Sequence, residues 1–215
     1  MFGAKAVIAA LEKGLEFELV MVPFNADDLY LPKHPEVLRV NPKQQVPVLI
    51  HTDLEIYDST QIFEYLEDLC PDPALWPKET RARARARLLE HQSDEVYFPH
   101  VVQLMIHEER IDGPEASAAR DAADRYHKQM EEQLLGRDYL AGSYSYADIA
   151  FFMAQLFGER KSAVLTEATP RLLAWRQRIA RRPAVREGIR PLVRHLEASG
   201  RPVPEFLKIT AGAGG

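Results

Sequence analysis

The stretch that decides the fold is NPKQQVPVLIHTDLEIYDSTQIFEYLEDL, residues 41–69. Two short apolar runs, at 46–51 and 54–58, are separated by a very short connection, which predicts a β-hairpin. Pro47 lies inside the first run. Because proline cannot donate a hydrogen bond to a strand ladder, it belongs at a sheet edge, a bulge or a special turn.

An amphipathic helix follows the hairpin from about Thr60 to Leu69. Asp58 precedes this helix and Gln61 stands three residues after Asp58, which is the spacing of a capping box. One interpretation is that these residues only cap the helix. The other is that the free amides of the helix start, together with the Ser59 hydroxyl, bind a carboxylate.

Pro47 favours the second interpretation. An X-Pro bond takes the cis form at a cost of only ~0.5–1 kcal/mol, and we expect the Val46–Pro47 bond to be cis. Val46 would then present its N–H and C=O to an extended peptide instead of to a neighbouring strand. A peptide-pairing edge and a carboxylate site at the next helix start together predict a small acidic peptide as ligand.

Composition excludes several classes of protein. The 215 residues are 46% apolar and 27% charged with a net charge of −5, which is typical of a globular protein and gives no reason to expect a nucleic-acid partner. No apolar run approaches the ~20 residues that span a bilayer, and no signal peptide is recognisable, so we expect a cytoplasmic protein without membrane contact. The only cysteine, Cys70, excludes an internal disulfide and a thiolate zinc site, and we expect it to be buried as an apolar filler.

The residues before this stretch predict a helix at 4–13, ended by Gly14, and a strand at 16–24. The proline-broken segment between that strand and residue 41 is expected to be irregular. Helix, strand, loop, hairpin and helix together make an α/β domain over residues 1–70 that lacks an opening strand.

The segment CPDPALWPKET is rich in proline and interrupts all periodicity, which predicts a linker at 71–79. Beyond it the chain is predicted to be an all-helical domain at 80–207, followed by a low-complexity flexible tail at 208–215. The expected helices lie near 79–110, 115–135, 145–158, 170–180 and 183–197.

Five segments of the chain resemble the soluble glutathione transferase family, and they occur in the family's order. These segments are ALEKGLEFELV, NPKQQVPVL, DSTQIFEYLED, YLAGSYSYADI and TPRLLAWRQRIARRPAV. The resemblance implies a thioredoxin-like N-terminal domain, an all-helical C-terminal domain and usually a homodimer. It also implies glutathione as co-substrate, a small electrophilic apolar compound as second substrate, and a role in detoxification.

The resemblance further assigns residues to the glutathione site. It implies that Pro47 is cis, that Val46 pairs with the cysteinyl unit, and that Asp58 and Ser59 hold the γ-glutamyl end. Gln45 matches the position beside the glycyl part. A tripeptide of this kind is the small acidic peptide that the residues alone predict.

The chain departs from the family at its beginning. Family members open with a strand and a loop that delivers a Ser, Tyr or Cys near the start of the first helix, and this side chain governs the thiol of glutathione. Aligned through EKGLEFE, Met1 falls one residue after the place where a Ser-Pro or Cys-Pro pair usually begins. The catalytic residue is therefore unknown, and we expect either a truncated or misassigned start or a departure from the enzyme state.

The remaining motifs give weaker evidence for a functional site. In GSYSYADI, Ser145 and Asp148 form a capping box whose role we expect to be structural. The histidines lack the spacing of metal ligands, so no metal site is predicted. Tyr97, His100 and Leu104 either line the second-substrate pocket or, as is commoner for this spacing, belong to the core.

The run RARARAR at 81–87 is not a single basic stripe. Helical spacing places Arg81 and Arg85 on one face and Arg83 and Arg87 on another. We interpret this segment as a solvated helix.

Two classes of function remain. In the first, bound glutathione attacks an electrophilic apolar compound as its thiolate. In the second, the chain is a non-catalytic glutathione transferase-like module for binding or assembly. A glutaredoxin-like reductase ranks behind both, because Cys70 lies far from the first helix.

Overall fold

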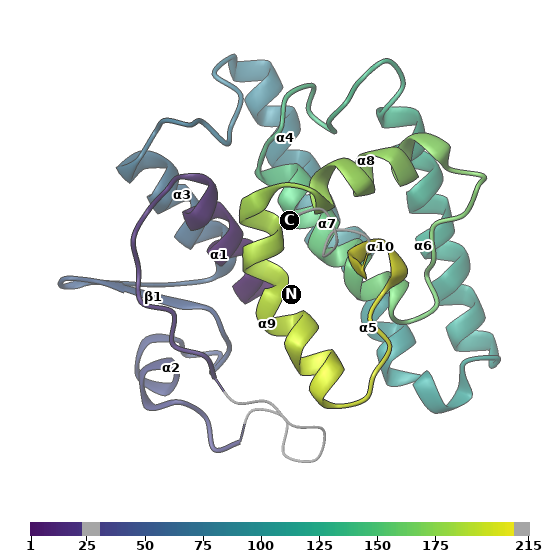
Figure 1. Cartoon of the computed structure of the whole chain (residues 1–215), viewed down its shortest axis with the longest axis horizontal. Coiled ribbons are helices and arrows are strands. Elements are labelled where there is room, and N and C mark those ends of the chain that lie inside the picture. Colours follow the sequence, from purple (N-terminus) through teal and green to yellow (C-terminus); the bar gives the residue numbers. More distant parts are fainter. Residues whose placement is uncertain (23–30, 209–215) are drawn as a thin grey trace. The chain divides into compact units, whose positions relative to one another are not determined.

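A computed structural model describes residues 1–22 and 31–208, and the chain divides into two compact units (Figure 1). The first unit runs from Phe2 to Pro73 and the second begins at Ala74. The division falls inside the segment that the proline-rich sequence marks as a linker.

The first unit packs two helices against a β-hairpin. Its described elements are α1 (Phe2–Glu12), α2 (Pro35–Val40), β1 (Val48–His51), β2 (Leu54–Tyr57) and α3 (Ser59–Leu69). The strands β1 and β2 are antiparallel, as the hairpin prediction requires. Small and branched side chains of α1 and α3 form the core between these helices, with Leu49 and Ile56 of the hairpin packed against it. These core side chains are Ala6, Ala10, Ile62 and Leu66.

A buried lysine joins the C-terminal ends of α1 and α3. The Lys13 ammonium lies 2.7 Å from the Glu67 carboxylate and donates to the carbonyl oxygens of Cys70 (2.6 Å) and Pro73 (3.1 Å). Because the Lys13 side chain is fully buried, its charge is stable there only with such acceptors. Gly14 ends α1 in the left-handed conformation (φ +64°), as predicted. Cys70 is half-buried, so the expectation of a buried filler is wrong.

The strand predicted at 16–24 is not formed over residues 16–22. These residues are mostly exposed and pair with no strand in the described part of the chain, while 23 and 24 lie outside the described residues. A strand needs a hydrogen-bonded neighbour, and the sheet seen among the described residues contains only β1 and β2. The alternating apolar residues at 16–22 are therefore insufficient to form a strand.

The segment expected to be irregular before residue 41 contains helix α2. Pro35 stands at its first position, where the missing N–H costs nothing and the fixed φ suits a helix. The His34 ring nitrogen Nδ1 accepts a hydrogen bond from the Glu36 amide (3.2 Å) and so caps the helix. Pro35 therefore begins a helix instead of breaking one.

The second unit is built of helices. Its described elements are α4 (Thr80–Gln92), the π-helical turn η1 (Ser93–Tyr97), α5 (Phe98–Ile106), the 3₁₀ turn η2 (Glu108–Arg110), α6 (Pro114–Gln133), α7 (Tyr146–Glu159), α8 (Pro170–Ala180), α9 (Pro183–Ala198) and α10 (Glu205–Lys208). The helices predicted near 115–135, 145–158, 170–180 and 183–197 are confirmed. The short helix α10 was not predicted, and the tail beyond it lies outside the described residues.

The helix predicted at 79–110 is interrupted by the π-helical turn η1. Pro99, at the start of α5, has no N–H to donate to a carbonyl in the preceding turn. A local π-helical turn shifts the hydrogen-bond register and accommodates this loss.

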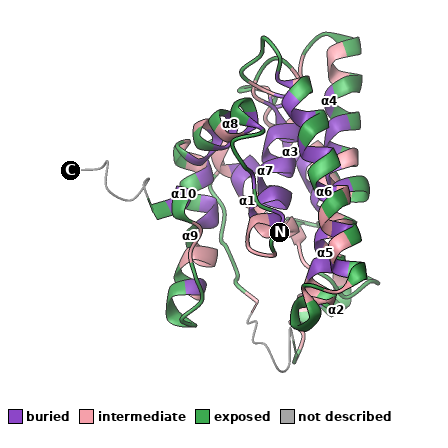
Figure 2. Cartoon of the chain, turned by 90° about the vertical axis from the view of Figure 1, so that its right-hand side faces the viewer, coloured by how far each residue is buried: buried purple, intermediate pink, exposed green. Residues whose placement is uncertain are grey.

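Helix α7 forms the centre of the second unit, and Figure 2 shows it as buried along most of its length. The Phe151 ring stacks on Trp175 of α8 with centroids 5.3 Å apart. The predicted capping box is present, because the Ser145 amide donates to Asp148 Oδ2 (2.9 Å). Asp148 Oδ1 accepts from the Leu140 amide (3.0 Å) and from Trp175 Nε1 (2.8 Å). Burial raises the pKa of Asp148 to about 6, although these hydrogen bonds oppose the rise.

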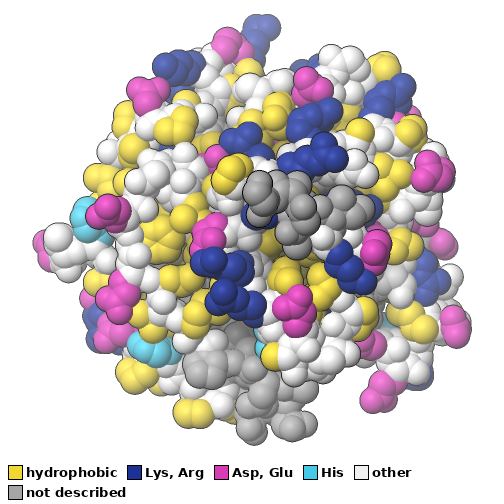
Figure 3. Space-filling view, in the orientation of Figure 1, with side chains coloured by type: hydrophobic (Ala, Val, Ile, Leu, Met, Phe, Trp, Pro, Cys, Tyr) yellow, Lys and Arg dark blue, Asp and Glu magenta, His cyan; other side chains and the backbone are white. Residues whose placement is uncertain are grey.

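Two surface properties bear on partners. On the face drawn in Figure 3, basic side chains are interspersed with acidic and apolar ones. None of the described helices is both long enough and apolar enough to cross a membrane.

Candidate functional site

The hairpin brings two predicted contact segments to one place. Val48 at the start of β1 lies opposite Tyr57 at the end of β2. The residues just beyond this pair are Pro47 on one strand and Asp58 on the other. Residues opposite each other in an antiparallel pair have Cα atoms ~4.5–5.5 Å apart. The segment ending at Pro47 and the start of α3 therefore lie next to each other at the open end of the hairpin.

The Val46–Pro47 peptide bond is cis, as predicted. Val46 is half-buried and precedes β1, so it is not part of the ladder with β2. Within the described residues, neither its N–H nor its C=O takes part in a hydrogen bond. An extended peptide could pair with both groups without displacing a strand.

A side chain that sequence reasoning missed holds the loop before Val46. Asn41 is buried, and its amide donates to the carbonyl oxygen of Gln45 (2.6 Å). The Asn41 Oδ1 atom accepts from the Lys43 amide (2.9 Å), which closes a tight turn. The Asn41-Pro42 pair was a turn signal in the sequence, but only the structure shows that this asparagine fixes the position of Gln45.

The Asp58 carboxylate caps the start of α3 with only one of its two oxygens. Asp58 Oδ1 accepts from the amides of Thr60 (3.0 Å) and Gln61 (3.2 Å). Its other oxygen, Oδ2, has no partner among the described residues, and the side chain is exposed. The Asp58 backbone adopts φ +75°, a conformation that residues other than glycine rarely take. Such backbone conformations cost ~1–3 kcal/mol and cluster at ligand sites.

Ser59 is the first residue of α3 and is 2% exposed. Its amide and hydroxyl belong to the first turn of the helix, at the positive end of the helix dipole. Because Asp58 supplies the cap, Ser59 is not needed to begin the helix. The arrangement can accept an anionic group at Ser59 and a cationic group at the open oxygen of Asp58.

The described residues offer neither a metal site nor a thiol at this place. No three His, Cys, Asp or Glu side chains among them are grouped as a metal would require. Cys70 caps the C-terminal end of α3, opposite to Ser59. At 1.5 Å per residue, that helix separates the two residues by ~16 Å.

The predicted pocket residues lie in the helical unit. Tyr97 and Leu104 are fully buried, whereas His100 is half-buried. The Tyr97 hydroxyl lies 2.9 Å from Nε2 of His127, and its ring packs edge-on against Phe151 with centroids 5.2 Å apart. Tyr97 and Leu104 therefore occupy core positions, and among the three only His100 offers surface to a ligand.

Comparison with known proteins gives matches in both units. Residues 1–69 match the family model described as "Glutathione S-transferase, N-terminal domain", and residues 94–183 match "Glutathione S-transferase, C-terminal domain". The chain belongs to the glutathione S-transferase family. The first unit is accordingly the family's thioredoxin-like domain, with a sheet of two strands among the described residues, and the second is its helical domain.

Relatives of this glutathione S-transferase family member match most of its length. "Probable glutathione S-transferase parC" of Nicotiana tabacum is 30% identical over 88% of this chain and 85% of its own. "Protein LigF" of a Sphingobium species is 31% identical over 85% of this chain and 87% of its own. Among solved structures, a glutathione S-transferase from Rhodospirillum rubrum has a TM-score of 0.78 and 25% identity, covering 96% of this chain and 93% of that one.

Proposed function

We propose that this chain binds glutathione at the open end of the β1–β2 hairpin and transfers the glutathione thiolate to an electrophilic apolar compound. One observation carries the proposal. The pairing of Val48 with Tyr57 places the cis Val46–Pro47 bond beside the start of α3. A peptide-pairing edge next to a helix N-terminus suits an extended, acidic tripeptide.

Each part of glutathione has a proposed contact. The γ-glutamyl carboxylate binds at Ser59, where the helix dipole favours an anion. The γ-glutamyl ammonium binds the open oxygen of Asp58 through a charge-assisted hydrogen bond. The cysteinyl unit pairs with the backbone of Val46, and Gln45 lies beside the glycyl end.

The test of binding is calorimetry with glutathione on Ser59→Ala. Because Asp58 caps α3, the variant is expected to keep its fold. Losing a hydrogen bond to a charged group costs ~1.5–3 kcal/mol, so affinity should fall roughly 10- to 150-fold. Ser117→Ala, on α6 of the other unit, is the matched control and should bind like the wild type. Equal affinity of the wild type and Ser59→Ala would remove Ser59 from the site.

The chemistry is tested separately from binding. In the transfer, the glutathione sulfur forms a bond to an electrophilic carbon while that carbon releases its leaving group with the bonding electrons. An activated aryl halide reports this reaction by a change in absorbance. Saturable conjugation that Ser59→Ala weakens would support an enzyme.

The alternative is a glutathione-binding module without transferase activity. It is favoured by the chemistry of the proposed contacts, since the Val46 backbone and the Asp58 carboxylate can hold the peptide but neither lowers the pKa of a thiol bound beside Val46. Glutathione binding without conjugation of the aryl halide would select this alternative.

We also propose the homodimer that is usual in the family. Light scattering should then give about twice the chain mass of 24.5 kDa. A mass of one chain over the working concentration range would contradict the dimer.

A further inference from the structure

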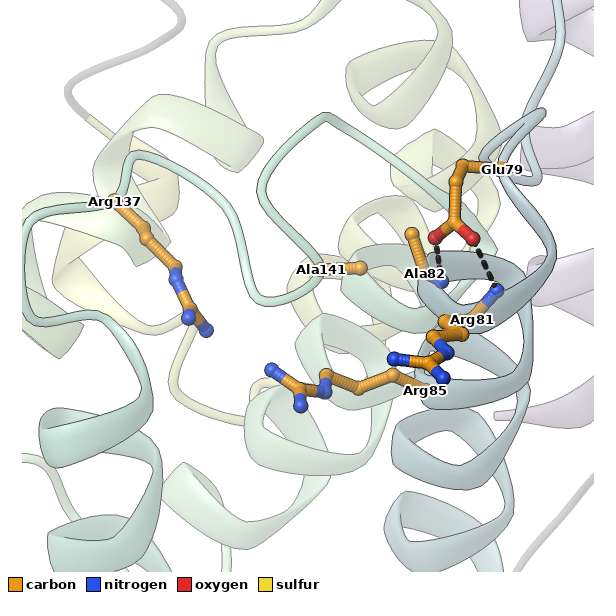
Figure 4. A pocket seen from close by; sticks show the side chains of 6 residues that line it. All are labelled: Glu79, Arg81, Ala82, Arg85, Arg137 and Ala141. Atoms are coloured by element: carbon orange, nitrogen blue, oxygen red, sulfur yellow. Dashed lines mark hydrogen bonds between the residues drawn. The ribbon is translucent and has the colours of Figure 1, made fainter.

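A basic hollow lies in the helical unit, apart from the residues assigned to glutathione. Its wall is formed by the first turns of α4 and by the segment that follows α6 (Figure 4). The cavity has a volume of about 300 Å³, at the lower limit of small-molecule sites. Its lining residues are Glu79, Arg81, Ala82, Arg85, Arg137 and Ala141.

Three guanidinium groups converge on this hollow. Arg81 and Arg85 stand four residues apart on one face of α4, the face that the RARARAR spacing predicts. In Figure 4, Arg85 and Arg137 extend toward each other from opposite walls. Like charges held on facing walls repel each other, and an anion between them would relieve that repulsion.

The only carboxylate in the lining is already engaged. Both oxygens of Glu79 are used to cap α4, one accepting from the Arg81 amide (2.9 Å) and the other from the Ala82 amide (2.7 Å). These hydrogen bonds lower the pKa of Glu79, so it is ionised at neutral pH. Three arginines and one glutamate leave the lining with a formal charge of +2.

The arginines of the hollow also differ from others of the same unit. Arg171, Arg176 and Arg178 each form an ion pair with a carboxylate. Among the described residues, Arg81, Arg85 and Arg137 have no acidic partner, and Arg137 makes only a long hydrogen bond of 3.5 Å to a carbonyl oxygen of α6. The planar donor pairs of their guanidinium groups remain available for an oxyanion.

We propose that this hollow binds the phosphate group of a small anionic compound. Arginine is suited to phosphate because two N–H groups can donate to two phosphate oxygens at once. The methyl side chains of Ala82 and Ala141 leave room beside the guanidinium groups for the rest of the ligand. The hollow shares no residue with the proposed glutathione site, so a variant of one leaves the side chains of the other unchanged.

Calorimetry with inorganic phosphate tests the proposal, at low ionic strength because salt screens exposed charges. We expect saturable binding to the wild type, weakened roughly 1.5- to fivefold in Arg85→Gln and in Arg137→Gln, the range for an exposed charge pair of ~0.2–1 kcal/mol. Arg125→Gln is the matched control, since Arg125 is exposed on α6 outside the lining and its loss changes the net charge equally. The control should bind phosphate as the wild type does.

A second kind of variant tests whether the volume of the hollow is needed for binding, without changing its charge. Ala82→Leu keeps a helix-forming residue in α4 and fills the hollow, so it should abolish phosphate binding while helical circular dichroism stays unchanged. Glutathione affinity should be the same in all these variants.

Three outcomes would overturn the proposal. The first is no saturable phosphate binding to the wild type. The second is an equal loss of binding in Arg125→Gln and Arg85→Gln, which would mark a net-charge effect. The third is binding of succinate at least as tight as that of phosphate, which would refute phosphate as the ligand group.

Discussion

Replacing Asp148 should destabilise the helical unit more than any surface change, because this carboxylate is fully buried and accepts four hydrogen bonds. Asp148→Ala removes the acceptor of the Ser145 hydroxyl, which can rotate, and of three fixed donors, which are the amides of Leu140 and Ser145 and the Trp175 indole N–H. Each unsatisfied buried donor costs ~1–3 kcal/mol. Since the three donors can relax together, we expect a loss of ~3–5 kcal/mol in the free energy of unfolding.

Asp148→Asn provides the matched comparison. Its side-chain oxygen can still accept from Leu140 and from Trp175, but its NH₂ group faces the Ser145 amide as a second donor. We expect a loss of ~1–2 kcal/mol, the cost of a helix cap. Urea unfolding at pH 7.5, above the raised pKa of about 6, keeps the wild-type carboxyl ionised.

Tryptophan fluorescence follows this unfolding well, because Trp76 and Trp175, the chain's only tryptophans, both lie in the helical unit. A loss of less than ~1 kcal/mol in Asp148→Ala would refute the account of this hydrogen-bond cluster, as would an Asn variant less stable than the Ala variant.

Three further changes test the packing and charge of the two units. Gly158→Ala would place a Cβ atom 2.3 Å from the buried Tyr97 hydroxyl, so the free energy of unfolding should fall by ~1–3 kcal/mol. Thermal unfolding should show this as a lower melting temperature, and an unchanged melting temperature would contradict that close approach. Burial lowers the pKa of His127 to about 4, so between pH 6.5 and 4 the unfolded chain takes up a proton that the folded chain resists, and stability should fall with acid by up to ~3 kcal/mol. His127→Gln should flatten this fall in urea titrations at several pH values, and a parallel pH profile would refute the assignment. Lys13→Met leaves Glu67 without its buried partner, so urea unfolding should show a loss of ~3 kcal/mol, and a stability equal to wild type would count against the ion pair.

Periodicity and caps made the helical unit predictable. Apolar residues at helical spacing predict the long helices, and the pair Ser145 and Asp148 marks the start of α7 in the sequence. What the sequence lacks is the set of distant partners. Nothing near Asp148 in the chain shows that Trp175 donates to it, because that contact exists only once α7 and α8 pack together.

Strand prediction failed at 16–22 for a related reason. An amphipathic pattern specifies which residues could face a core, but a ladder depends on a neighbouring strand that local sequence does not report. At α2 the error was the opposite, since prolines were taken as breaks where Pro35 begins a helix. The hairpin was predictable because both of its strands and their turn are adjacent in the chain.

The candidate site was predicted from residues that interrupt a strand or begin a helix. Pro47 and Asp58 were visible as a proline inside a strand run and as a helix cap. Asn41 was missed because its role depends on a buried contact with the Gln45 carbonyl. The pocket interpretation of Tyr97 could not be weighed without burial, which the spacing of aromatic residues does not determine.

The most direct test of the proposed function is a crystal structure of the chain with glutathione. Our account predicts a peptide ligand at the open end of the hairpin, with the Val46 N–H and C=O both hydrogen-bonded to the cysteinyl unit. It also predicts the γ-glutamyl carboxylate within ~3.2 Å of the Ser59 amide or hydroxyl. Glutathione bound elsewhere, or bound here with its carboxylate away from Ser59, would contradict the account.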